Sequence, residues 1–193
     1  MIRQHIFAPC IPTRASKVPS GPDWLHEIKH DGYRLIVQRD VARVRLFTRR
    51  GYDWSDRFPR IIEAARKLRT PSFVIDGEAV CLAENGLSDF DRLHSRKHNA
   101  DARLIAFDLL SLGGDDIRSD PLHARKARLE KLLAKSSDGI QINEHLAGEI
   151  GPAMFRHACK LGLEGIVRSA GIGLIAPDVR RTGSRSRTRQ RLR

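Results

Sequence analysis

The chain has 193 residues, of which 40% are hydrophobic and 30% are charged, and its formal net charge is +12. This length and composition argue against a disordered or membrane protein and predict one globular domain with its own core. No apolar run reaches the roughly 18 residues that span a bilayer, and residues 1–22 lack the apolar core of a signal peptide. These features predict a cytoplasmic protein that has no membrane partner.

The positive charge is unevenly distributed along the chain. Seven arginines and no acidic residue lie within 180–193, so the remainder of the chain is only mildly basic. A nucleic-acid partner and an ordinary solvated surface therefore explain the net charge equally well. We interpret residues 169–193 as an arginine-rich tail of low complexity and predict that it is disordered.

The first part of the chain contains short strand patterns separated by turns. Strands are predicted at Trp24–Lys29 and Tyr33–Gln38, on either side of an Asp-Gly turn that would join them as a hairpin. A further strand is predicted where Ala42, Val44 and Leu46 alternate with Arg43, Arg45 and Phe47. Pro59 then begins an amphipathic helical pattern.

Strands also dominate the middle of the chain. Phe73–Ile75 and Ala79–Leu82 are predicted as two strands, and an Asn-Gly turn follows the second. Ser88 is a candidate N-cap for a short helix that continues to Arg96. Arg103–Leu110 has the apolar character of a buried strand.

A second long helix is predicted from Pro121 onward. Its inner face is predicted to carry leucines and its outer face cations, namely Leu122, Leu129, Leu132 and Leu133 against Arg125, Lys126 and Lys131. A third helix at about Glu149–Leu161 and a last strand at Leu163–Val167 follow. Strands in hairpins with interspersed helices predict an α+β fold with mainly antiparallel sheets.

The most informative motif is Lys29-x-Asp31-Gly32-x-Arg34, which follows Glu27 closely. It sets a lysine at the end of one strand and an arginine at the start of the next. A neighbouring cation favours the neutral, nucleophilic form of an amine. Taken alone, the motif also fits a plain hairpin whose charged residues face water.

This motif resembles the nucleotidyltransferase signature shared by ATP-dependent DNA ligases, RNA ligases and capping enzymes. Four later segments resemble further motifs of that family in the same order: Thr48-Arg49-Arg50-Gly51, Asp76-Gly77-Glu78, Phe107-Asp108-Leu109-Leu110 and Glu164-Gly165-Ile166-Val167. Each segment is a weak signal alone, whereas five in one order are specific. The stretch Trp24–Lys29 is similar to bacterial DNA ligases that serve end-joining repair. The resemblance implies a nucleotidyltransferase fold of antiparallel sheets flanked by helices, with residues 1–168 as the adenylation domain.

The resemblance also implies a nucleotide site. Lys29 would attack the α-phosphate of ATP and keep AMP on its side-chain nitrogen, and the AMP would then activate a 5′-phosphate so that a DNA nick can be sealed. Glu27 would contact the adenine amino group, and Phe107 would stack on the adenine ring. Arg34 and Arg49 would lie beside the ribose and phosphates. Without the resemblance, a core position would be the default for Phe107.

A metal ion and macromolecular partners follow from the same resemblance. Glu78 and Glu164 would bind Mg²⁺, and Glu78 would also contact the nucleotide, because carboxylates suit a hard divalent ion. Without the resemblance, both glutamates would fit exposed turns. The implied partners are nicked or broken duplex DNA and the proteins of end-joining repair.

The sequence departs from the family's pattern near its C-terminal end. Ser169 stands where the fourth motif continues with a lysine, and 170–193 contains no lysine although a Lys-x-Lys motif is expected there. By the resemblance we also expect that the OB-fold domain that follows in the family is missing, and a shifted reading frame is one hypothesis for this ending. We expect impaired catalysis, since one preorganised donor is commonly worth about 100-fold or more in rate.

Several functional hypotheses stay open at this point. The chain is a ligase adenylation domain with full or weak activity, an inactive fragment that binds ATP without transfer, or a nucleic-acid-binding protein that uses its arginine-rich tail. An RNA ligase or capping-type nucleotidyltransferase is the alternative within the enzyme class. Glu27 and the segment Thr48–Trp54 favour the DNA ligases over that alternative.

Overall fold

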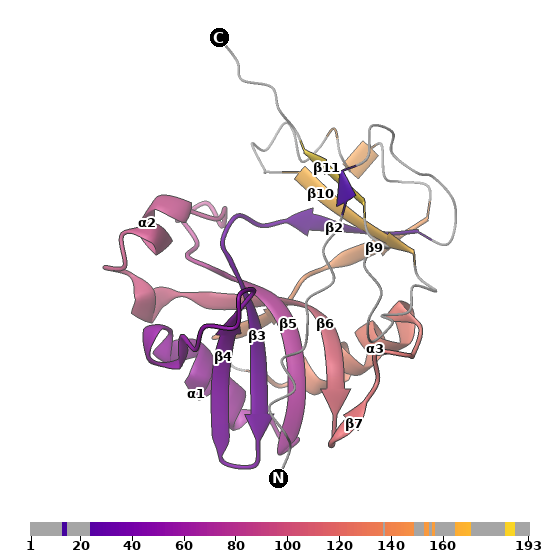
Figure 1. The fold of residues 1–193 in the computed structure, drawn as a ribbon. Coiled ribbons are helices and arrows are strands. Elements are labelled where there is room, and N and C mark those ends of the chain that lie inside the picture. Colours follow the sequence, from indigo (N-terminus) through magenta and orange to yellow (C-terminus); the bar gives the residue numbers. More distant parts are fainter. Residues whose placement is uncertain are drawn as a thin grey trace.

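Two β-sheets form the frame of the molecule in the computed structural model, which describes residues 13–14, 24–136, 138–148, 153–154, 156, 165–170 and 184–187. The larger sheet has the order β4-β3-β5-β6-β7, and β8 pairs with β6. The smaller sheet has the order β1-β11-β10-β2-β9 and lies across one end of the larger sheet (Figure 1). Among the described residues nearly all strand pairs are antiparallel, and the exceptions are β6 with β8 and β1 with β11. The prediction of an α+β fold with mainly antiparallel sheets is confirmed.

The elements have the following bounds. The larger sheet contains β3 (Tyr33–Asp40), β4 (Arg43–Thr48), β5 (Ser72–Val80), β6 (Arg103–Leu112), β7 (Asp115–Asp116) and β8 (Ile140–Ile142). The smaller sheet contains β1 (Thr13–Arg14), β2 (Trp24–Lys29), β9 (His145–Ala147), β10 (Gly165–Ala170) and β11 (Ser184–Arg187). The α-helices are α1 (Pro59–Lys67), α2 (Phe90–His94) and α3 (Leu122–Leu133), and the 3₁₀ helices are η1 (Ser55–Arg57) and η2 (Asn99–Asp101).

The main hydrophobic core lies between the larger sheet and the helices α1 and α3. Ile61 of α1 and Leu129 of α3 are fully buried and belong to the same cluster as Leu35 and Leu104 of the sheet. Burial of such side chains contributes about 1.5–3 kcal/mol each, so this interface fixes both helices on one face of the sheet. A smaller cluster around Ile36 lies apart from this core.

The short helix α2 begins at a different cap from the expected one. Asp89 is its N-cap, and its carboxylate accepts a hydrogen bond of 3.0 Å from the backbone nitrogen of Arg92. Ser88 forms an isolated antiparallel bridge with Leu82, which holds Ser88 in extended backbone. The prediction of Ser88 as the cap was therefore wrong by one residue.

The predicted hairpin between the first two strands is wrong. β2 pairs with β9 and β10, whereas β3 pairs with β4 and β5, so the Asp-Gly connection passes from one sheet to the other. Gly32 makes this crossing possible because a Cβ atom at that position would lie 2.1 Å from the carbonyl oxygen of Ala79 in β5. The connection therefore passes closely over the larger sheet instead of reversing the chain.

We predict that Gly32→Ala lowers the free energy of unfolding by about 1–3 kcal/mol, because the added methyl group forces the backbone away from Ala79. Chemical denaturation measures this loss. Arg50→Ala, at an exposed position, is the control, and it should change stability by less than about 0.5 kcal/mol. A Gly32→Ala protein as stable as the wild type would contradict the close approach.

The strand β5 is continuous, although two separate strands were predicted. It runs through Asp76-Gly77-Glu78 without interruption. A Cβ atom at Gly77 would lie 2.8 Å from the carbonyl oxygen of Ile105, so the glycine serves close contact with β6 and does not mark a break. The third motif is therefore held inside the sheet.

The C-terminal predictions are only partly covered by the described residues. Of the predicted helix Glu149–Leu161, residues 153, 154 and 156 are helical. The other positions of this predicted helix lie outside the described residues. The last strand, β10, extends to Ala170 and so includes Ser169. Ser184–Arg187 forms β11, a strand within the segment predicted to be disordered, and the remaining positions after 170 lie outside the described residues. Among the described residues, no helix has the length and apolar character needed to cross a membrane.

Candidate active site

Lys29 is the last residue of β2 and is half-buried. In the antiparallel ladder it faces Gly165 of β10. Because side chains alternate along a strand, Glu27 lies on the same face of β2 as Lys29. Glu27 is 5% exposed, which is unusual for a carboxylate. The amine and this buried carboxylate therefore project from one strand to one side.

Arg34, Glu78 and Phe107 come together on one face of the larger sheet. Arg34 of β3 lies directly opposite Glu78 of β5. The Arg34 guanidinium carbon lies 5.1 Å from the centre of the Phe107 ring, a cation–π contact. Three of the predicted site residues thus share this face.

A buried carboxylate fixes Arg34. Its Nε donates to Asp76 Oδ1 at 2.9 Å and its Nη2 donates to Asp76 Oδ2 at 2.6 Å. Burial raises the pKa of the Asp76 carboxyl, and the Arg34 cation opposes that rise. This bidentate pair has the planar geometry that only arginine provides, so it locks the guanidinium in orientation.

Phe107 lies in a β-bulge of β6. Asp76 of β5 is opposite Asp108, and Gly77 is opposite Ala106, so Phe107 is the extra residue between them. A bulge turns its residue away from the regular ladder and frees its backbone groups. Phe107 is half-buried in this position, unlike an ordinary core phenylalanine.

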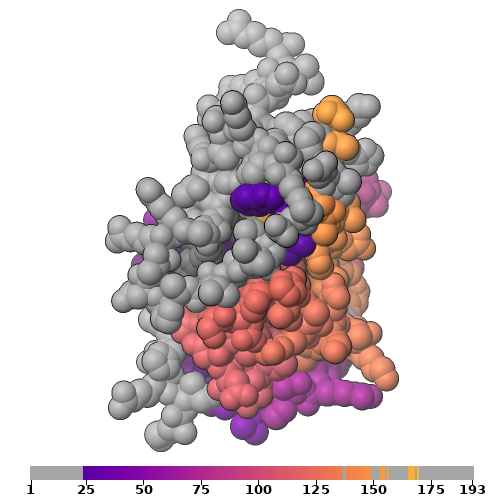
Figure 2. Space-filling view, turned by 90° about the vertical axis from the view of Figure 1, so that its right-hand side faces the viewer, coloured from indigo at the N-terminus to yellow at the C-terminus, as the bar shows by residue number. Residues whose placement is uncertain are grey.

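The helix α3 supplies two buried cations, which corrects the prediction that they lie on its outer face. Arg125 and Lys126 are 2% and 1% exposed. Arg125 donates from Nε to Asp108 Oδ1 at 2.9 Å and from Nη2 to Asp108 Oδ2 at 3.0 Å. The segment that carries β7 and α3 lies at the surface in Figure 2, whereas the low exposure of these two cations places their side chains in the interior.

Lys126 connects the two sheets. Its Nζ donates to Glu27 Oε1 at 2.7 Å and to the carbonyl oxygen of Phe107 at 2.8 Å. Burial raises the pKa of the Glu27 carboxyl, and attraction to Lys126 is the largest influence that lowers it. One ammonium group thus holds β2 against β6 at the bulge.

Asn143 makes a second connection between the same strands, and sequence reasoning missed it. Its side-chain nitrogen donates to the carbonyl oxygen of Ile28 in β2 at 3.1 Å. Its backbone nitrogen donates to the carbonyl oxygen of Ala106 in β6 at 2.7 Å. The loop between β8 and β9 therefore helps to place the strand that carries Lys29.

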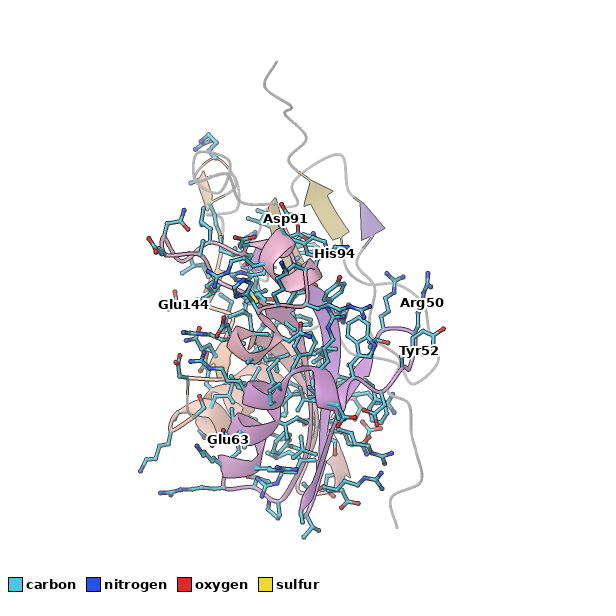
Figure 3. All side chains as sticks on the ribbon, turned by 90° about the vertical axis from the view of Figure 1, so that its left-hand side faces the viewer. Arg50, Tyr52, Glu63, Asp91, His94 and Glu144 are labelled. Atoms are coloured by element: carbon cyan, nitrogen blue, oxygen red, sulfur yellow. The ribbon has the colours of Figure 1, made fainter. Side chains whose placement is uncertain are left out.

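The Thr-Arg-x-Gly segment forms the turn that ends β4. Thr48 Oγ1 accepts a hydrogen bond of 3.1 Å from the backbone nitrogen of Tyr52, and Gly51 has a φ of +83°, which glycine adopts without strain. Leu35 pairs with Thr48 in the antiparallel ladder of β3 and β4. The exposed Arg49, the next residue after Thr48, therefore lies at the same end of this ladder as Arg34. Arg50 and Tyr52 project outward from this turn in Figure 3.

Glu164, the second predicted metal ligand, lies outside the described residues. The following residue, Gly165, begins β10 opposite Lys29. The described part of the chain therefore brings together Glu27 with Lys29, and Arg34 with Glu78 and Phe107, and it links the two groups through Lys126.

These motifs and this fold match one known family. The family described as "ATP dependent DNA ligase domain" matches residues 11–180, so the chain belongs to this family.

The chain is also similar to a bacterial end-joining protein and to a bacterial DNA ligase. It is 36% identical over 165 residues to the multifunctional non-homologous end joining protein LigD of Pseudomonas aeruginosa, covering 83% of this chain and 19% of that protein. It is 38% identical over 138 residues to DNA ligase C2 of Mycolicibacterium smegmatis, covering 66% of this chain and 38% of that protein. The chain thus spans well under half the length of these relatives.

A solved structure has the same fold. The mycobacterial DNA ligase D in complex with ATP and MES superimposes with a TM-score of 0.81 at 28% identity, covering 94% of this chain and 60% of that one. The prediction of a ligase nucleotidyltransferase fold is confirmed.

Proposed function

We propose that this chain carries out the adenylation step of a DNA ligase, with Lys29 as the residue that becomes covalently joined to AMP. The observation that carries the proposal is the placement of Lys29 and Glu27 on one face of β2, held against the Phe107 bulge by Lys126. The relative that was solved with ATP has the same fold, which supports ATP as the substrate.

The proposed reaction is a phosphoryl transfer to nitrogen. The lone pair of neutral Lys29 Nζ forms a bond to the α-phosphorus of ATP, the bond from that phosphorus to the bridging oxygen of the β-phosphate breaks, and pyrophosphate leaves. The amine loses a proton to solvent. Such a transfer depends on in-line positioning and on neutralising the phosphate oxygens. The position of Lys29 at the end of a strand paired with β10 supports the first requirement.

The other site residues are proposed to bind the nucleotide. Glu27 accepts a hydrogen bond from the amino group of adenine, and Phe107 stacks on the ring. Arg34, fixed by Asp76, and Arg49, on the adjacent turn, contact the ribose and phosphates. The half-buried state of Phe107 supports this role over a core role.

Glu78 and Glu164 are proposed to hold Mg²⁺. Protein sites for this ion use about one or two carboxylates together with substrate phosphates, so Glu78, half-buried and opposite Arg34 in the ladder, fits as one ligand. Within the described residues, which do not include Glu164, no cluster of three or more metal-binding side chains occurs. When bound, the ion neutralises charge on the phosphate oxygens.

The biological substrate is proposed to be nicked or broken duplex DNA, with end-joining repair proteins as partners. The similarity to LigD proteins supports this choice. Residues 1–168 are proposed as the adenylation domain, and 169–193 as an arginine-rich segment that follows it and contributes β11 to the smaller sheet.

Labelling with ATP tests the proposed function directly. The full chain is incubated with Mg²⁺ and either α-labelled or γ-labelled ATP, then denatured and separated by electrophoresis. We expect label on the protein from the α-phosphate only, because pyrophosphate carries the γ-phosphate away. Label from neither nucleotide would contradict the adenylation step, and label from the γ-phosphate would show a different transfer.

A further inference from the structure

Lys126 is a buried cation behind the candidate site that takes no part in the phosphoryl transfer itself. Its side chain is 2% exposed, and that of its partner Glu27 is 6% exposed. Lysine is almost never fully buried unless it is paired, because removing its charge from water is costly. The burial of a lysine at this position therefore needs an explanation other than packing.

The geometry of Lys126 gives that reason. The two groups that accept from its Nζ are the carboxylate of Glu27 and the backbone carbonyl of Phe107, at 2.7 and 2.8 Å. Glu27 is the residue proposed to bind the edge of the adenine base, and Phe107 is the residue proposed to stack on its face. They belong to different sheets, so the ammonium sets the position of one relative to the other.

We infer that Lys126 is a positioning residue that gives this site its preference for adenine over guanine, an inference that rests on the proposed function. Adenine presents an exocyclic amino group, a donor, where guanine presents a carbonyl oxygen, an acceptor. An ionised carboxylate only accepts hydrogen bonds, so it pairs with the first group and repels the second. A carboxylate has about four acceptor positions, and therefore one ammonium leaves capacity for the base.

The charge of Lys126 keeps Glu27 in the required state. Burial and the nearby Asp108 raise the pKa of the Glu27 carboxyl, while Lys126 and a hydrogen bond from Asn143 lower it. Without the ammonium, the buried carboxyl takes up a proton more readily. A protonated carboxyl donates a hydrogen bond, which guanine accepts and the adenine amino group does not.

Binding of ATP and GTP to the full chain tests the inference. Dissociation constants are measured by calorimetric titration at neutral pH without Mg²⁺, which separates binding from transfer. Lys126→Met removes the ammonium and keeps an unbranched side chain. We expect the ATP affinity to fall about ten-fold or more and the preference for ATP over GTP to fall by a similar factor, the range for losing a hydrogen bond to a charged group.

Three further variants separate positioning from stability. Lys126→Arg keeps the charge and should retain most of the preference. Lys126→Gln keeps a donor without the charge, so it should lose preference and provides the uncharged test if Lys126→Met does not fold. Leu129→Ala removes a buried side chain from the same helix, so it should lower stability and leave the ratio of the two affinities unchanged.

The outcomes distinguish the inference from the function on which it rests. A wild-type chain that binds no ATP would overturn both. A wild-type chain that binds ATP and GTP equally, or folded Lys126→Met and Lys126→Gln proteins with the wild-type ratio, would overturn the inference alone. Loss of preference in these two variants, but not in Leu129→Ala, supports it.

Discussion

Lys29→Arg is expected to abolish the covalent adduct with AMP, with a loss of at least about 1,000-fold in the rate of labelling. The guanidinium group remains protonated at every accessible pH and has no lone pair to offer to phosphorus. Because the positive charge is retained, we expect ATP to bind with an affinity close to that of the wild type. Labelling with α-labelled ATP and a binding titration measure the two effects separately.

A neighbouring residue provides the control for this variant. His30→Ala alters the next position in the chain without removing the proposed nucleophile, and it should retain the adduct. If Lys29→Arg is still labelled, the nucleophile is another residue. If Lys29→Arg no longer binds ATP, the lysine acts mainly in binding and the proposed role is wrong.

Arg34→Met is expected to lower the free energy of unfolding by about 3–5 kcal/mol, because it leaves the buried carboxylate of Asp76 without its cation. The same change removes the group above the Phe107 ring. We therefore expect both thermal stability and adduct formation to fall. Thermal denaturation and α-labelling measure these effects on one preparation.

A double variant separates these two consequences. Replacing a buried ion pair by apolar residues of similar volume is often neutral for stability, so Arg34→Met with Asp76→Leu should recover much of the lost free energy. It should not recover labelling, since the proposed contact with the nucleotide is still missing. Recovery of both would show that Arg34 serves the fold alone.

Local patterns predicted the positions of most elements. Pro59 begins α1 as expected, and the alternation over 42–47 corresponds to β4. These features depend on neighbours within a few residues, which the sequence displays directly. The motif segments likewise indicated which strands carry the candidate site, since each motif is contiguous in the chain.

The pairing of β2 could not be predicted from local patterns. An Asp-Gly pair between two strands favours a hairpin. Here Gly32 instead permits a close approach to Ala79, a residue distant in sequence. The choice between a reversal and a crossing depends on contacts that form only in the folded state.

The helical spacing of Lys126 indicated that it is buried, whereas its charge favoured the opposite interpretation. Leu122, Lys126 and Leu129 have the spacing of one helical face, so periodicity places the lysine inward. Its charge suggested the outer face, because lysine is usually exposed. Its partner Glu27 lies almost a hundred positions earlier, and the carbonyl of Phe107 is available through a bulge that the sequence does not mark. Asn143, in a loop, gave no comparable signal.

The site of AMP attachment is the central claim, and mass spectrometry of the protein after incubation with ATP and Mg²⁺ tests it most directly. Digestion with a protease that does not cut at lysine, at a pH that preserves the phosphoramidate bond, should give one peptide heavier by the mass of AMP. Fragmentation should place that mass on Lys29. An adduct on Lys126 or on any other residue, or a fully unmodified protein, would contradict the account.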